Sequence, residues 1–187
     1  VLFVPVVGNV VVPLPGLALG HFDWSVMQAG IGLFFWPLVL LLVLARRAAH
    51  SVLPDRLLPT WFISVAPPSV LGVVAFQFQA PTWVMQMAWA MAAFCLLWVA
   101  PVLARARRAG FHMGFWALSF PLASLASLTL VLGDAMAASG AASDAWMQQL
   151  SVVVLVLVSV VILALSLMTV RGLRNGTLLV PEPVPAG

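Results

Sequence analysis

The sequence predicts an all-α membrane protein that crosses the bilayer several times, with proline-kinked inner helices around a pore and straighter outer helices. Of its 187 residues, 64% are hydrophobic and only 7% are charged, a composition outside the range of soluble domains. Five apolar runs each approach the ~20 residues that a helix needs to cross the hydrocarbon layer. The connections between these runs are alternately rich in arginine and free of it, as expected for a chain that crosses a membrane repeatedly.

The five full runs, and one irregular apolar stretch before them, are expected to be the membrane-spanning helices. The expected spans are residues 1–19, 24–44, 58–77, 83–103, 112–132 and 146–170. The first span is irregular because prolines and a glycine interrupt it at Pro5, Pro13, Pro15 and Gly16. Residues 1–170 therefore form one transmembrane domain. Residues 171–187, with Pro181, Pro183 and Pro185, are expected to be an extended or disordered cytoplasmic tail.

Arginine marks one side of the membrane. The arginines follow every second span and are absent from the connections between: Arg46, Arg47, Arg56, Arg105, Arg107, Arg108, Arg171 and Arg174. The positive-inside rule makes this side cytoplasmic, so the protein is expected in the inner, or plasma, membrane with its C-terminus in the cytoplasm. Because these arginines flank apolar runs and can contact lipid phosphates, the net positive charge does not predict nucleic-acid binding.

The chain starts at Val1 without a methionine or a signal-peptide pattern, and its first residues are already apolar. We therefore expect it to be the C-terminal part of a longer protein, with further spans preceding Val1.

The spans alternate in their content of small and helix-breaking residues. Residues 58–77 contain three prolines and a glycine, and residues 112–132 contain Gly114 and Pro121, whereas residues 146–170 contain neither type. Proline kinks a helix and frees a backbone carbonyl, which in lipid needs a partner from protein or water. The irregular spans are therefore expected inside the bundle and the smooth ones against lipid, in two concentric layers. The alternative is that the prolines only shape helix packing.

The spans have no charged residue at their centres, which limits the chemistry that they can carry. Buried ionisable residues usually mark proton relays and coupling-ion sites. His21, His50 and His112 are far apart and lie at membrane ends, so no metal or haem site is predicted. Cys95 is expected to be a buried apolar side chain rather than a reactive thiol. No catalytic residue and no cofactor is predicted, and the protein is not expected to be an enzyme.

With charged, metal and catalytic sites excluded, the spans can still form an uncharged path lined by small residues, backbone groups and aromatic rings. Such a path can pass an anion if helix N-termini and backbone N–H groups at kinks partly compensate for its lost water. A neutral lining also lets the anion leave, which favours a channel over a pump.

Three stretches carry a family pattern in order: Val-Val-Gly-Asn-Val-Val-Val-Pro at residues 6–13, Leu-Pro-Thr-Trp-Phe-Ile-Ser-Val-Ala-Pro-Pro at 58–68, and Phe-Trp-Ala-Leu-Ser-Phe-Pro-Leu at 115–122. They resemble the tellurite-resistance/C4-dicarboxylate transporter family, which includes the plant slow-type anion channels and the yeast malate and sulfite transporters. The resemblance extends to about residue 170. It implies a homotrimer of ten-helix subunits, each with five inner helices around its own pore, and residues 1–19 would be the fifth helix.

The resemblance also implies that a phenylalanine on the ninth helix blocks the pore, and Phe120 stands at the matching position. Phe115 is the competing candidate, and ordinary packing is the alternative role for Phe120. The other candidates for lining or kinking the pore are Gly8, Asn9, Pro13, Pro67, Pro68, Ser119 and Pro121; packing and capping are their alternative roles. Many relatives have two tryptophans where this chain has Phe115-Trp116, and threonine in place of Ser119, which affects the expected substrate more than the fold.

The leading functional hypothesis is a passive channel or exporter for small anions: halide, nitrate, sulfite, a tellurite-related oxyanion or a dicarboxylate. One alternative is a proton-coupled carrier of C4-dicarboxylates such as malate, with its coupling group in the spans before Val1. Another is a membrane assembly subunit that conducts nothing. The expected partners are the lipid bilayer, small anions and two further copies of the protein.

Overall fold

The computed structural model describes residues 3–49, 55–108, 110–138, 145–176 and 178. Every regular element within these ranges is a helix. Five helical segments of the described residues are long and apolar enough to cross a membrane: Phe22–Arg46, Leu57–Gln77, Thr82–Arg108, Met113–Ala137 and Trp146–Arg174. A shorter apolar segment covers Pro5–Ala18. The predicted class, an all-α protein with several membrane spans, is confirmed.

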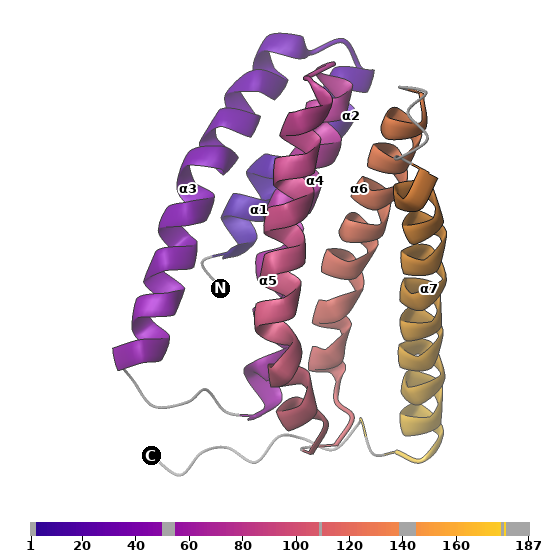
Figure 1. Ribbon diagram of the computed structural model, residues 1–187. Helices are drawn as coiled ribbons and strands as arrows, with labels where there is room; N and C mark the ends of the chain where they lie inside the picture. Colours follow the sequence, from indigo (N-terminus) through magenta and orange to yellow (C-terminus); the bar gives the residue numbers. More distant parts are fainter. Residues whose placement is uncertain (1–2, 50–54, 109, 139–144, 177, 179–187) are drawn as a thin grey trace.

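The helices form three hairpins, each joining an irregular span to a smooth one (Figure 1). The first joins α1 (Phe3–Val11) and α2 (Pro13–Ala18) to α3 (Phe22–Ala49). The second joins the 3-10 helix η1 (Asp55–Val65) and α4 (Ala66–Gln77) to α5 (Thr82–Arg108). The third joins the 3-10 helix η2 (Met113–Leu118) and α6 (Ser119–Ala137) to α7 (Ala145–Arg174).

The first two hairpins turn through the same backbone motif. After α2, the N–H of His21 donates to the carbonyl of Gly16, and Gly20 adopts a φ of 79°. After α4, the N–H of Ala80 donates to the carbonyl of Ala75, and Gln79 adopts a φ of 55°. Both are Schellman caps, which satisfy the last carbonyls of a helix and need one left-handed residue. Glycine adopts that conformation easily, whereas Gln79 is an exposed non-glycine residue that adopts it at the same position of the motif.

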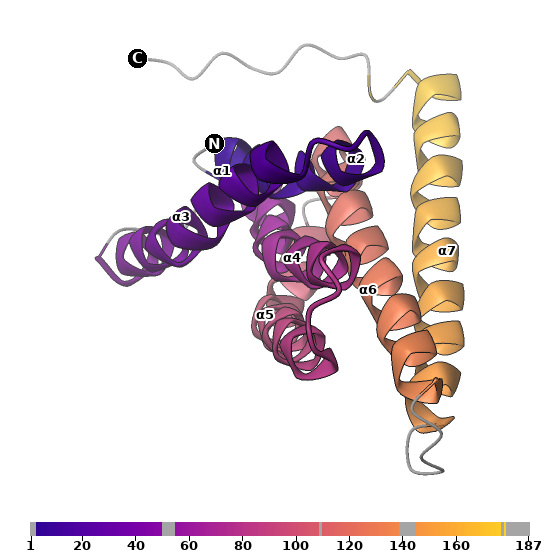
Figure 2. The ribbon, with the colours of Figure 1, turned by 90° about the horizontal axis from the view of Figure 1, so that it is seen from above.

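The irregular and smooth spans form two layers. In the most apolar stretch of each span, 67% of residues are buried for Leu57–Gln77 and 44% for Met113–Ala137, but only 11 to 17% for the spans built on α3, α5 and α7. Seen from above, α4 lies in the middle of the bundle, with α3 on one side and α6 and then α7 on the other (Figure 2). The predicted contrast between proline-bearing inner spans and smooth outer spans therefore holds in the described residues.

All the arginines belong to the same end of the bundle. The helices α3, α5 and α7 finish there, and η1 and η2 begin there (Figure 1). We call it the arginine end, and we call the opposite end, which carries Asp23 and Asp134, the acidic end. Clusters of arginine next to long apolar helices suit the headgroup layer, where their side chains reach lipid phosphates.

The helices run past the predicted apolar runs. The predicted span 83–103 continues as helix to Arg108, and the span 112–132 continues to Ala137. Helical hydrogen bonds persist where the chain enters the polar interface, because hydrophobicity marks only the part of a helix that crosses the hydrocarbon. At the C-terminus, α7 includes Arg171 and Arg174, and the rest of the predicted tail lies mostly outside the described residues.

Cys95 is 1% exposed, in a core formed by α5 with its neighbours. In the folded protein, a membrane-impermeant maleimide is expected to leave this thiol unmodified, because no water reaches it. Denaturation in SDS should then give one label per chain, which a gel-shift assay measures. Complete labelling without denaturant would show that this part of α5 is not packed as described.

Candidate functional site

Both inner spans of the second and third hairpins change helix type partway. Each begins as a 3-10 helix at the arginine end and becomes an α-helix, after Val65 in one and after Leu118 in the other. Prolines sit just past each change: Pro67 and Pro68 lie in the first turn of α4, and Pro121 lies in the first turn of α6. A proline is tolerated in the first turn of a helix, because the N–H groups of that turn have no partner within the helix and little is lost when one is missing. The prolines thus mark a switch of helix type rather than a bend within an α-helix.

A hollow of about 210 Å³ lies where the two 3-10 helices approach α1. Its lining comes from three spans: Val7 of α1, Ile63 of η1, and Trp116, Ala117, Phe120 and Pro121 of η2 and α6. A 3-10 helix is wound more tightly, and is therefore thinner, than an α-helix. This favours open space between η1, η2 and α1. The hollow is lined by apolar side chains and is large enough for several water molecules.

Phe120 and Phe115 lie in different surroundings. Phe120 is 44% exposed and lines the hollow. Phe115 is 7% exposed and packs in the core, with its ring 5.9 Å from that of Phe111 and 4.9 Å from that of His112. Of the two phenylalanines considered from the sequence, the one matched to the family gate is therefore the one beside open space.

The other predicted site residues divide into two groups. Gly8 follows Val7 on α1, and a side chain there would meet no atom within 4 Å. The Asn9 side-chain amide donates to the carbonyl of Pro5, four residues earlier in α1, at 2.9 Å. In contrast, Pro13, Pro67 and Pro68 are buried between helices and do not line the hollow.

Trp116, which lines the hollow, and the serines next in sequence to lining residues, Ser64 and Ser119, already have hydrogen-bond partners. The hydroxyls of Ser64 and Ser119 donate to the carbonyls of Trp61 and Trp116, at 2.8 and 2.7 Å. The indole N–H of Trp116 donates away from the hollow, to Thr169 Oγ1 at 3.0 Å. These bonds satisfy groups that would otherwise be costly in lipid, and an anion in the hollow finds the same donors occupied.

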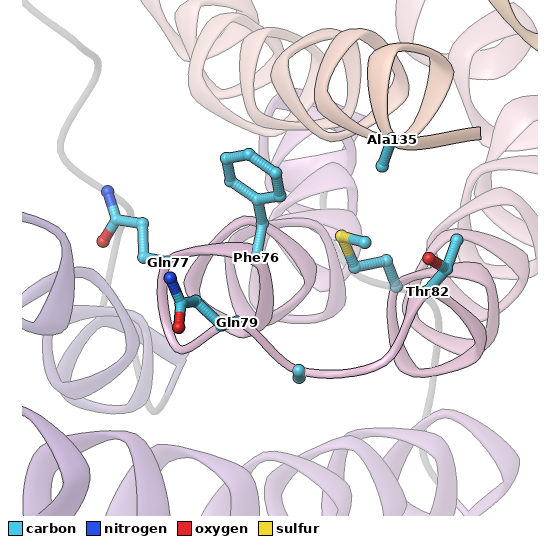
Figure 3. Close-up of a pocket in the computed structure, with 7 residues that line it drawn as sticks. Phe76, Gln77, Gln79, Thr82 and Ala135 are labelled. Carbon is cyan, nitrogen blue, oxygen red and sulfur yellow. The ribbon is translucent and has the colours of Figure 1, made fainter. Parts of the chain in front are cut away.

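A second, wider depression of about 520 Å³ lies at the acidic end. It is lined by Phe76, Gln77, Gln79, Ala80, Thr82 and Met85 of the second hairpin and by Ala135 of α6. Figure 3 shows the Phe76 ring extending from its helix toward the side of Ala135, with the two glutamines lying to one side. This depression opens at the end of two inner spans, far along them from Phe120.

Comparison with protein families matches residues 1–170 to SLAC1, described as a voltage-dependent anion channel. The chain belongs to the SLAC1 family. The family resemblance carried by the three sequence stretches is thereby confirmed, and so is the general role of the protein in anion transport across a membrane. Comparisons with curated proteins and with solved structures gave no match.

Sequence reasoning missed four residues that line the hollow of this SLAC1-family chain: Val7, Ile63, Trp116 and Ala117. Trp116 could have been found, because it lies about one helical turn before Phe120 and so shares its face. Val7 and Ile63 carry no such signal, since the same residue types face lipid on the outer spans. Their position depends on how each inner span is rotated about its axis.

Proposed function

We propose that the protein is a passive anion channel of the plasma membrane, with Phe120 as the gate of a path that runs beside α1, η1 and η2. The observation that carries this proposal is the hollow itself, because it brings Phe120 together with Val7 and Ile63 from two other irregular spans. Membership of the SLAC1 family supports anions as the transported species. The physical role of Phe120 is steric and dewetting, since an aromatic ring in an apolar constriction interrupts the water column that an ion needs.

Passive conduction fits the chemistry of the inner spans. In the described parts of the chain, Asp23 and Asp134 lie at the acidic end and do not line the hollow, and Asp55 begins η1 at the arginine end. A carboxylate at membrane depth is the usual site of proton coupling. We therefore favour a channel over a proton-coupled dicarboxylate carrier that would use a carboxylate of these spans.

The face of α1 at Gly8 and the exposed side of Phe120 need a further wall for a closed pore. We propose that four helices earlier in the full-length chain supply it, that the complete subunit has ten helices, and that three subunits assemble as a trimer. In this arrangement the arginine end and the C-terminus face the cytoplasm, in agreement with the positive-inside rule.

The occupied donors around the hollow predict the order of permeability. An anion there gains little hydrogen bonding in return for lost water, so weakly hydrated nitrate is expected to pass better than chloride, and dianions such as malate and sulfite worst. A difference of ~1.4 kcal/mol in this cost changes permeability about tenfold. Anion-substitution recordings of the full-length protein in planar bilayers measure the order from reversal potentials.

The same recordings separate the alternative functions. Current that follows the anion gradient and ignores a pH gradient supports the channel. Flux that requires a proton gradient would establish the carrier instead, and no flux from correctly folded full-length protein would favour the assembly subunit.

A further inference from the structure

Two tryptophan–threonine hydrogen bonds connect the inner layer of helices to the outer layer. The indole N–H of Trp116, in η2, donates to Thr169 Oγ1 of α7 at 3.0 Å. The indole N–H of Trp89, in α5, donates to Thr129 Oγ1 of α6, also at 3.0 Å. In each pair the threonine hydroxyl donates in turn to a carbonyl of its own helix, that of Leu165 or Leu125, at 2.8 and 2.7 Å. The two connections are chemically the same.

Only the first of these bonds involves a wall of the hollow. Trp116 lines it together with Phe120, about one helical turn later in the same span. Trp89 packs against the buried cluster that contains Leu128 and Leu132 and also against the one that contains Leu118, but it does not line the hollow. The described part of the chain thus contains one such bond at a wall of the hollow and a matched bond whose residues do not line it.

The bond to Thr169 determines which part of Trp116 faces the hollow. Because the N–H points to α7, the side chain presents apolar ring atoms to the hollow that Phe120 also lines. An indole N–H that loses its partner inside a membrane must find another acceptor, because leaving it unpaired is costly. The hollow, which can hold water, offers one.

We propose that Thr169, on the outer helix α7, is a positioning residue for the gate. Its hydroxyl holds the indole of Trp116 as the wall against which Phe120 closes, and keeps the indole N–H out of the anion path. This inference rests on the proposed function. It assigns to an outer helix a role in setting both the closed state and the anion preference of the pore.

The test compares Thr169→Val with Thr169→Ser and with the matched control Thr129→Val, in the full-length protein at equal surface expression. Thr169→Val is expected to raise the basal chloride current about three- to tenfold, the scale of one lost interhelical hydrogen bond. It should also lower the ratio of nitrate to chloride permeability, because the released N–H offers a donor to the more strongly hydrated anion. Thr169→Ser keeps the hydroxyl and should behave as wild type. Thr129→Val should leave both quantities unchanged.

Trp116→Phe supplies an independent variant, since it keeps an aromatic ring but has no N–H to be held. It is expected to raise the basal current without lowering the nitrate to chloride ratio, and Thr169→Val should add nothing to it. In a Phe120→Ala background, Thr169→Val should likewise give no further rise in current, because the gate it positions is gone.

Three results would overturn the inference while leaving the channel intact: a wild-type current in Thr169→Val, an equal rise in Thr129→Val, or a full additional rise in the Phe120→Ala background. An equal rise in the control would show that loosening any contact between the layers opens the pore. If the wild-type protein carries no anion current at all, the proposed function fails, and the role of Thr169 fails with it.

Discussion

Phe120→Ala is expected to raise the basal anion current about tenfold or more at equal surface expression, because lowering a conduction barrier by ~1.4 kcal/mol is enough for that change. The ring is 44% exposed and lies in a hollow shared by three spans. Removing it widens the apolar hollow on the proposed path and lets water fill it. Single-channel or macroscopic recordings in symmetric chloride measure the effect.

Two phenylalanines serve as controls for this substitution. Phe76 is 47% exposed, lies on the inner helix α4 and lines the depression at the acidic end. Phe76→Ala therefore removes an equally exposed ring from the inner layer without touching the proposed gate, and it should leave the basal current near the wild-type value. Phe115→Ala removes a buried ring and should lower the yield of folded protein rather than open the pore. An unchanged current in Phe120→Ala, or an equal rise in Phe76→Ala, would remove Phe120 from the gating role.

The layer arrangement was accessible from the sequence because its cause is local. Prolines and small residues at Pro59, Pro67, Pro68 and Gly72 identify an inner span, since their backbone groups need protein or water as a neighbour. The run of valine and leucine in α7 has no such need and lies outside. The placement of the arginines at one end follows from helix length and the number of crossings, which sequence also gives.

The 3-10 helices and the hollow were not accessible in the same way. No residue in 55–65 distinguishes a 3-10 helix from an α-helix by type, because the choice depends on how η1 packs against α5 and η2. The partnership of Trp116 with Thr169 joins residues far apart in sequence. Such pairs depend on the rotation and depth of each helix, and the hydrophobic pattern constrains these only weakly when both sides of a span are apolar.

Gly72→Val is expected to destabilise the protein by about 1–3 kcal/mol, the usual cost of forcing extra atoms into a packed core. At Gly72, α4 comes close to both α5 and α6. A Cβ atom there would lie 2.5 and 2.7 Å from the two δ-carbons of Leu128 and 3.1 Å from the Cβ of Ala88. Leu128 is fully buried and has little room to move away. Thermal denaturation of the detergent-solubilised full-length protein, followed by size-exclusion chromatography, measures the loss.

The chain provides both a control and a rescue for this prediction. Gly8 also lies on an inner helix, but a side chain there meets nothing within 4 Å, so Gly8→Val should change stability by less than about 0.5 kcal/mol. Leu128→Ala removes both δ-carbons that the new side chain would strike. The double variant should therefore be more stable than the two single effects predict, with a coupling of about 1 kcal/mol or more. Additive effects, or equal losses in the two glycine variants, would mean that α4 does not contact α6 at this point. The inner layer would then need a different arrangement around the hollow.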